Sequence, residues 1–323
     1  MQVNGADGQR EPSGTTPTVL YIGGWGRSGS TLLECLLAEA EQTVALGEVV
    51  WLWDRGLVRN ELCACSQPFH DCPFWTEVGR TAFGGWDRVD ADRMASLKDA
   101  VDRQRRMVHS ARRAPGAAFR AQVEEYAGHF RAVYRAAAAV SGAGVVIDSS
   151  KEIPTALALS HLDDLDLRVL HIVRDSRGVA HSWSKVVERP EAGGEPMPQF
   201  SPTRSTVQWL AGNLAVAGLT HRGVPLTRLR YEDLVADPTG SIEQAWLALD
   251  LPGRADVPML DATTVELHPT HSVAGNPMRF RTGPTQLRRD DAWRTEMSDA
   301  DRRLVTALSY PVLKSFGYLE QDR

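Results

Sequence analysis

The chain has 323 residues, of which 42% are hydrophobic and 24% charged, the composition of a globular protein with a sizeable core. Its 36 basic and 41 acidic residues leave a net charge of -5, which argues against sequence-independent binding of nucleic acid, since that needs a basic face, although a local basic pocket is still allowed. Four cysteines, no apolar run of membrane-spanning length and no signal-peptide pattern predict a cytoplasmic protein without a transmembrane segment. Residues 1–16, rich in Gly, Ser, Thr and Pro, predict a disordered tail before a single α/β domain over 17–323.

The first predicted elements are a strand, a glycine-rich turn and a helix. Thr18–Ile22 is a short apolar run of β-forming residues that stops at two glycines, and apolar residues then recur at helical spacing over 32–40. A helical insertion is predicted over about 60–142. Within it, the apolar residues from Phe119 to Ala137 repeat with the spacing of one face of a long helix.

Three further strands are predicted after the insertion. They cover residues 145–147, 167–173 and 226–230, and a helix over about 155–162 separates the first two. Strands that alternate with helices through long connections indicate a mostly parallel sheet flanked by helices. The predicted fold is therefore of the α/β class.

The turn after the first strand, Gly24–Thr31, has the spacing of the phosphate-binding loop G-x-x-x-x-G-K-[ST], with one departure. Ser30 replaces the lysine, which counts against ordinary ATP or GTP chemistry, and a cation stands three residues earlier as Arg27. Backbone N–H groups at the start of a helix favour a bound anion, so the fold is predicted to be of the P-loop type. The predicted anion-binding residues are Gly26, Arg27, Ser28, Gly29, Ser30 and Thr31.

Two segments together resemble a known family. Gly26–Leu33 resembles the 5′-phosphosulfate loop of sulfotransferases that use 3′-phosphoadenosine-5′-phosphosulfate (PAPS), and Val173–Ser182 resembles their 3′-phosphate segment. The resemblance implies Arg174 and Ser182 as ligands of the 3′-phosphate. Arg174 falls at the carboxyl end of a predicted strand, where open α/β sheets bind ligands, and a guanidinium with a hydroxyl suits a phosphate.

Shorter segments extend the resemblance over most of the chain. Leu46–Glu48 resembles a turn that carries a glutamate base in tyrosylprotein and several bacterial sulfotransferases, and Val146–Lys151 resembles a strand-end D-S-S-K segment. Arg230–Leu234 and Gly275–Arg279 resemble later family segments, the second of them a loop over the nucleotide. The further nucleotide-binding residues that these segments imply are Tyr231, Asn276 and Arg279, the last near the 3′-phosphate.

The resemblance implies a PAPS-dependent sulfotransferase of bacterial type. Sulfuryl transfer, like phosphoryl transfer, is an in-line displacement in which positioning and charge stabilisation do most of the catalysis. Glu48 is the predicted base on the acceptor hydroxyl, and Arg27 and Lys151 are the predicted cations on the leaving phosphate; no metal is required. The acceptor, whether a small molecule, a sugar or a lipid-linked hydroxyl, stays open, as does the oligomeric state.

Other functions also stay open. A P-loop kinase using ATP is one, although Ser30 argues against it; a non-catalytic protein that binds PAPS or its product, adenosine 3′,5′-bisphosphate, is another, although Glu48 and Lys151 argue against it. A zinc-dependent interaction module would leave both phosphate segments unexplained.

A cysteine-rich loop has no single interpretation from sequence. It contains Cys63, Cys65, His70 and Cys72. Thiolates and imidazole suit zinc, but C-x-C followed by six residues and a third cysteine is not a standard finger spacing, so zinc binding, redox chemistry and simple packing all stay open. His268 and His271 lie in a proline-containing loop and are a weak metal pair.

Two more clusters are interpreted as structural. Tryptophans around the start of the insertion favour core packing over an acceptor pocket, and the basic run over 103–113 favours a solvated helix face. The tryptophans are Trp51, Trp53, Trp75 and Trp86.

Overall fold

The computed structural model describes residues 16–103, 116–189 and 194–319; the predicted tail lies outside them except for its last residue. Five parallel strands form the central sheet in the order β2-β3-β1-β4-β7. They are β1 (Thr18–Gly24), β2 (Thr43–Ala45), β3 (Val145–Lys151), β4 (Asp166–Val173) and β7 (Leu226–Arg230). The predicted α/β class with a mostly parallel sheet is confirmed, and the short edge strand β2 was not predicted.

The central strand β1 is buried on both faces. It pairs with β3 on one side and β4 on the other. Successive side chains of a strand point to opposite faces, so Val19 and Tyr21 enter one layer of the core while Leu20 and Ile22 enter the other. Strands covered on both faces have near-continuous apolar sequences, which is why this strand was predictable.

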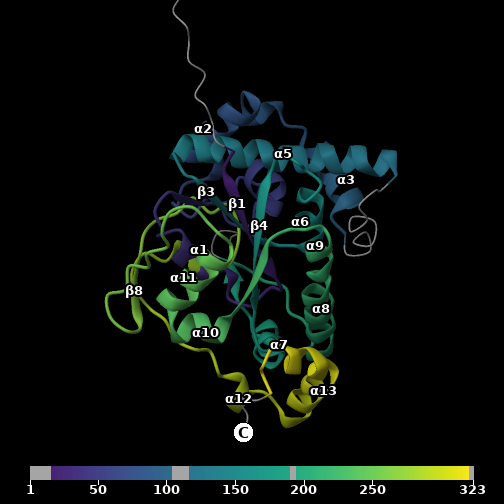
Figure 1. Ribbon diagram of the computed structural model, residues 1–323, viewed down its shortest axis with the longest axis vertical. Coiled ribbons are helices and arrows are strands. Elements are labelled where there is room, and N and C mark those ends of the chain that lie inside the picture. Colours follow the sequence, from purple (N-terminus) through teal and green to yellow (C-terminus); the bar gives the residue numbers. More distant parts are fainter. Residues whose placement is uncertain (1–15, 104–115, 190–193, 320–323) are drawn as a thin grey trace, which may run out of the picture.

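Helices cover the two faces of the sheet (Figure 1). Residues of α1 (Ser30–Leu37), α10 (Tyr231–Ala236) and α11 (Pro238–Ala248) pack on one face. Residues of α5 (Ala117–Ser141), α6 (Ile153–Leu159) and α9 (Ala217–His221) pack on the other. The predicted apolar face of α5 is confirmed: Val123, Tyr126, Phe130, Val133 and Ala137 are all buried.

The insertion packs into the same core as the α5 face of the sheet. Its described elements are η3 (Phe69–Asp71), α2 (Pro73–Phe83), η4 (Trp86–Arg88) and α3 (Ala91–Val101), with α5 closing it; η1 (Val49–Trp51) and η2 (Leu52–Val58) come just before it. Trp53, Trp75 and Trp86 are buried and Trp51 is half-buried, which confirms the prediction of core packing. Of the basic run, Arg103 forms an exposed ion pair with Asp99, and residues 104–113 lie outside the described residues.

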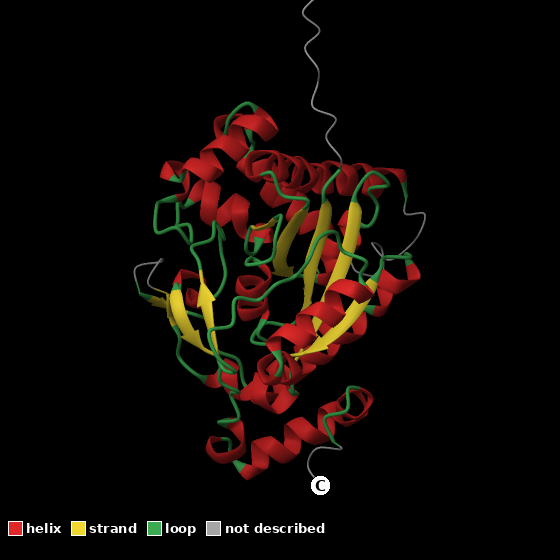
Figure 2. Ribbon diagram, turned by 60° about the vertical axis from the view of Figure 1, so that its left-hand side comes forward, coloured by secondary structure: helices red, strands yellow, loops and turns green. Residues whose placement is uncertain are grey.

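The remaining elements lie beyond the insertion. They are α7 (Ser176–Ser184), β5 (Glu188–Arg189), β6 (Glu195–Pro196), α8 (Pro202–Ala215), β8 (Thr264–Leu267), η7 (Pro277–Phe280), β9 (Gly283–Gln286), α12 (Trp293–Glu296) and α13 (Asp299–Ser315). Figure 2 shows the β8–β9 hairpin standing apart from the main sheet. Among the described residues, no helix has both the length and the apolar character to cross a bilayer.

Candidate active site

Most of the predicted site residues lie at the carboxyl ends of the parallel strands. The central strand β1 leads into the phosphate loop. On one side of β1, Glu48 follows β2 and Lys151 is the last residue of β3. Arg174 and Tyr231 follow β4 and β7 on the other side. Because parallel strands end at one edge of the sheet, the strand order alone divides the site into a Glu48–Lys151 half and an Arg174–Tyr231 half, with the phosphate loop between them.

The phosphate loop is held between two aromatic rings. Gly29 has a φ of 90°, in the left-handed region, and a Cβ there would lie 2.5 Å from the ring of Tyr231. A Cβ at Gly26 would lie 2.7 Å from the ring of Trp183, whose Nε1 donates to the carbonyl of Gly26 at 3.1 Å. Both contacts are closer than any side chain tolerates, so only glycine fits at these two positions.

Several donors of the loop have no partner within the described protein. The hydroxyl of Ser28 and Nε of Arg27 are buried without a hydrogen bond, and α1 begins without a side-chain cap. The first N–H groups of any helix also lack intrahelical partners. Unpaired buried donors are costly, and a bound anion would satisfy them. The loop therefore fits a phosphate or sulfate group.

Arg27 supplies positive charge at this loop. Its guanidinium lies over the ring of Trp183, 5.1 Å from the centroid, and Nη2 lies 3.3 Å from the sulfur of Met197. Burial lowers the pKa of Arg27, and the negative charge of Glu48 partly offsets this effect. An arginine nevertheless stays charged at neutral pH, so the site keeps a cation whose charge interacts with that of Glu48.

Glu48 and Lys151 form an ion pair beside the phosphate loop. Nζ of Lys151 donates to Oε1 of Glu48 and, at 3.1 Å, to the carbonyl of Ser149. The side chain of Lys151 is only 14% exposed and that of Glu48 only 13%. Lys151 has a φ of 68°, a left-handed conformation that costs free energy in a residue with a side chain and is concentrated at functional sites.

Sequence reasoning missed Glu34, a buried carboxylate on α1. The Ser149 hydroxyl donates to its Oε2 at 2.6 Å, and the Ser272 hydroxyl donates to Oε1. Burial raises the pKa of Glu34, and the two hydroxyl bonds and the charge of Lys151 counteract that rise. Glu34 therefore ties α1 to the end of β3 and to the loop around Ser272. It stands between apolar residues of a short helix, so no sequence pattern singled it out.

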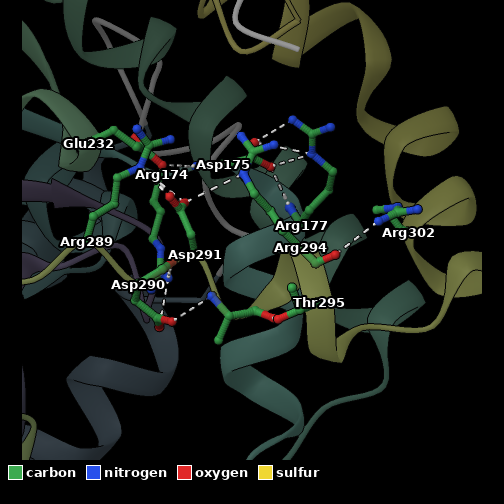
Figure 3. Close-up of polar contacts among 11 residues, drawn as sticks. Arg174, Asp175, Arg177, Glu232, Arg289, Asp290, Asp291, Arg294, Thr295 and Arg302 are labelled. Atoms are coloured by element: carbon green, nitrogen blue, oxygen red, sulfur yellow. Dashed lines mark hydrogen bonds and ion pairs between the residues drawn. The ribbon is translucent and has the colours of Figure 1, made fainter.

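Arg174 is buried at the start of α7, in the other half of the site (Figure 3). Its Nη1 donates to the carbonyl of Arg27 at 3.2 Å, and its Nη2 contacts both the carbonyl and Oδ2 of Asp290 at 2.9 Å. The guanidinium lies 4.7 Å above the centroid of the Tyr231 ring. Ser182 is half-buried on α7, which starts at Ser176 as expected. Asp290 had not been identified from the sequence.

Asp175, next to Arg174, is fully occupied by structural contacts. Its carboxylate caps α7 by accepting from the N–H of Arg177 and pairs with that side chain at 2.6 Å, as Figure 3 shows. Its own N–H donates to Glu232 at 3.1 Å, which in turn accepts from Tyr318. This buried network fixes the backbone from which Arg174 projects, and leaves Asp290 as the carboxylate that Arg174 contacts.

Arg279 and Asn276 lie on the Glu48 side of the phosphate loop. Arg279 is only 2% exposed, and its guanidinium donates to the carbonyls of Ser272 and Leu62, each at 2.9 Å. Asn276 caps η7 through the N–H of Met278. Two buried carbonyls thus hold Arg279 against the cysteine-containing loop, and this position gives no support to its predicted role at the 3′-phosphate.

The cysteine loop has a different histidine from the one its sequence suggested. Four ligand atoms lie within 4.8 Å of one another, and they belong to Cys63, Cys65, Cys72 and His271. His70 is exposed, with Nε2 3.0 Å from the carbonyl of Leu57, and His268 pairs with Glu39 at 2.7 Å. The local sequence pointed to His70 because it lies between the cysteines, whereas His271 arrives from a distant loop.

Comparisons with known proteins identify one family. The model described as "Sulfotransferase family" matches residues 19–256. The sulfotransferase domain from the curacin biosynthetic pathway is 15% identical (TM-score 0.46, covering 91% of this chain and 98% of that one). The domain from the Synechococcus PCC 7002 olefin synthase is 18% identical (0.41, 93% and 97%), and sulfotransferase STF9 from Mycobacterium avium is 11% identical (0.46, 94% and 78%). No curated protein sequence matches the chain.

Proposed function

The chain belongs to the sulfotransferase family of transferases, and we propose that it moves the sulfuryl group of PAPS to a hydroxyl group. The acceptor would be a small molecule, a sugar or a lipid-linked compound. The observation that carries the proposal is the enclosed Glu48–Lys151 pair beside a phosphate loop whose buried donors lack partners. A carboxylate, a lysine and an anion-binding loop are the groups that proton removal and sulfuryl transfer need in one place.

The phosphate loop would bind the 5′-phosphosulfate end of the donor. The hydroxyls of Ser28, Ser30 and Thr31 and the N–H groups at the start of α1 would bond the anion, and Arg27 would neutralise part of its charge. PAPS supplies a sulfuryl group on a phosphate that leaves as a stable anion, so this chemistry needs no metal. Arg174 and Ser182, on the other side of the loop, would hold the 3′-phosphate.

Glu48 would accept the proton of the acceptor hydroxyl. Lys151 orients the Glu48 carboxylate through their hydrogen bond, and the Glu48 N–H donates to the carbonyl of Ala274 at 3.2 Å, which holds the backbone of the turn. Lys151 and Arg27 would also stabilise charge that develops on the leaving phosphate. Such fixed charges act most strongly where water is excluded, and both side chains of the ion pair are largely enclosed.

The direct test is transfer of label from [³⁵S]PAPS to a panel of phenols, sugars and lipid-linked alcohols, in the presence and absence of Mg²⁺. We expect labelled product with at least one acceptor class, at the same rate with and without Mg²⁺. Transfer of ³²P from [γ-³²P]ATP with a strict Mg²⁺ requirement would instead identify a kinase. Tight binding of adenosine 3′,5′-bisphosphate without transfer to any acceptor would favour a non-catalytic binding protein.

A further inference from the structure

Four soft ligand atoms converge where the insertion meets the loop that contains Ser272. Sγ of Cys72 lies 3.7 Å from Sγ of Cys63, 3.6 Å from Sγ of Cys65 and 3.4 Å from Nδ1 of His271. Sγ of Cys63 lies 3.8 Å from the same Nδ1. A tetrahedral zinc ion with Zn–S bonds of about 2.3 Å and a Zn–N bond of about 2.0 Å places its sulfurs about 3.8 Å apart and sulfur and nitrogen about 3.5 Å apart. The four separations agree with these edges, and the other two, from Sγ of Cys65 to Cys63 and to His271, lie within 4.8 Å.

We propose that Cys63, Cys65, Cys72 and His271 bind one structural zinc ion. Four protein ligands complete a tetrahedron and leave no position for water or substrate, which is the arrangement of structural zinc sites. Cys63 and Cys72 are buried, and the other two ligands are half-buried, so the ion would be enclosed by protein. This proposal does not depend on the sulfuryl-transfer reaction.

The surroundings of the cluster favour a metal over a disulfide. All three cysteines are free, and the sulfur of Cys72 is about equally distant from the other two, far beyond the roughly 2.05 Å of a disulfide bond. A single disulfide could join only two of the three sulfurs, whereas one metal ion can bind all three.

The histidine is held in the orientation that such a site needs. Its ring stacks on Phe74, with 4.6 Å between centroids and an interplanar angle of 11°, and its carbonyl accepts from Nε1 of Trp75 at 2.7 Å. Nδ1 therefore faces the three sulfurs. Three thiolates on Zn²⁺ would leave the site with one negative charge. The buried cation of Arg279 is near enough to balance it, since it donates to the carbonyl of Leu62, the residue before Cys63.

The ion would join two segments that are far apart in the chain. His271 is 199 residues from Cys72, and beyond it the same loop contributes the Ser272 hydroxyl to Glu34 and the Ala274 carbonyl to the N–H of Glu48. Zinc at this point would hold that loop against the insertion. It would thereby hold the Ala274 carbonyl, which accepts from the N–H of Glu48, in place. The four ligands would thus be positioning residues with no contact to the reacting atoms.

The test is the metal content of the full chain, purified without a chelator or a histidine tag and measured by inductively coupled plasma mass spectrometry. We expect about one zinc per chain, and less than about a tenth of that in His271→Ala and Cys72→Ser. Two matched controls should keep the wild-type zinc content: His70→Ala removes the exposed histidine of the same loop, and Cys35→Ala removes a buried cysteine on α1.

Three further measurements keep the test decisive if a ligand variant folds poorly. His271→Cys should retain zinc as a four-thiolate site, and Co²⁺ in place of zinc should give the intense sulfur-to-metal charge-transfer absorption of a tetrahedral thiolate site. Hydrogen exchange over residues 271–280 should quicken when zinc is removed from the wild type. The proposal is overturned if the folded wild type lacks zinc even after incubation with excess Zn²⁺. Iron in place of zinc, or a His271→Ala variant with wild-type zinc, also overturns it.

Discussion

Arg174 and Asp290 form an ion pair in which Nη2 of the guanidinium lies 2.9 Å from Oδ2 of the carboxylate. Burial opposes ionisation of Asp290, but the hydrogen bond and the charge of Arg174 outweigh it, so the pKa of Asp290 is lowered. Asp290 is therefore ionised at neutral pH. A 3′-phosphate bound by Arg174 would have to share or displace this carboxylate, so on the proposed function the ion pair would oppose donor binding.

Replacement of that carboxylate tests this competition. Asp290→Asn keeps the size of the side chain but removes its charge, so we expect adenosine 3′,5′-bisphosphate to bind about threefold to tenfold more tightly, as measured by calorimetry. Asp291→Asn is the matched control: Asp291 lies in the same segment but pairs with Arg289, and the affinity should not change. Weaker binding to Asp290→Asn would show instead that Asp290 orients Arg174 for the ligand.

The 3′-phosphate itself should be recognised through Arg174. Adenosine 3′,5′-bisphosphate should raise the melting temperature more than equal concentrations of 5′-AMP or ATP, because stabilisation grows with affinity as RT ln(1 + [L]/Kd). The double variant Arg174→Ala/Asp290→Asn removes both charges and so leaves no carboxylate without its cation. It should lose the preference for the bisphosphate but bind 5′-AMP as the wild type does. An unchanged preference would place the 3′-phosphate elsewhere.

The sequence was sufficient to predict the strands and helices that have a clear hydrophobic pattern of their own. The central strand β1 and helix α5 were predicted because a doubly buried strand is continuously apolar and a one-sided helix repeats its apolar face. The edge strand β2 has three residues, and the two antiparallel hairpins are short and partly exposed. Such segments carry too little hydrophobic pattern to be distinguished from loops.

The sequence predicted which site residues lie at strand ends, but it could not predict which residues contact one another across the fold. Parallel strands end at one edge, so Arg27, Lys151 and Arg174 could be placed there from their positions after predicted strands. Glu48 follows the unpredicted strand β2 and was identified only through the family resemblance. The bond between Glu48 and Lys151 joins residues 103 apart, and that between Arg174 and Asp290 joins residues 116 apart. His271 likewise reaches the cysteines by tertiary folding, and no local spacing records such contacts.

Glu152 should make the stability of the protein depend on pH. Burial, followed by the negative charge of Asp102, raises its pKa from 4.5 to about 7, although Lys98 and Lys151 oppose the rise. Between these two values the folded state binds more protons than the unfolded state, so the free energy of unfolding falls as pH rises through this window. Burial also raises the pKa of Asp148 to about 6, which adds to the fall below that pH.

Glu152→Gln should therefore flatten the fall in stability between pH 5 and pH 7.5. At pH 8 the variant should be more stable than the wild type by roughly 1–3 kcal/mol in urea unfolding, because it no longer buries a charge. Glu243→Gln, at an exposed position of α11, is the control and should leave the pH profile unchanged. Parallel profiles for Glu152→Gln and the wild type would show that Glu152 does not take up a proton on folding.

Substitution of Glu48 should affect catalysis without affecting donor binding. Glu48→Gln keeps an oxygen that can accept from Lys151 but cannot take up a proton, so kcat should fall by about 10²–10⁴-fold while the affinity for adenosine 3′,5′-bisphosphate stays nearly constant. Arg27→Ala and Lys151→Ala should lower both quantities, because these cations would contact the donor in the ground state as well as in the transition state. Steady-state kinetics and calorimetry on the same preparations measure the two effects.

A second glutamate provides the matched control for this prediction. Glu34→Gln changes a buried carboxylate that contacts Ser149 and Ser272 behind the ion pair, so it should lower kcat by less than about tenfold, the effect of altered positioning and not of a lost base. If Glu48→Gln keeps more than about a third of the wild-type kcat, Glu48 is not the base. His181 is then the next residue to test. Its Nε2 lies 3.0 Å from Oε2 of Glu296, and a histidine oriented by a carboxylate in this way is suited to accept a proton.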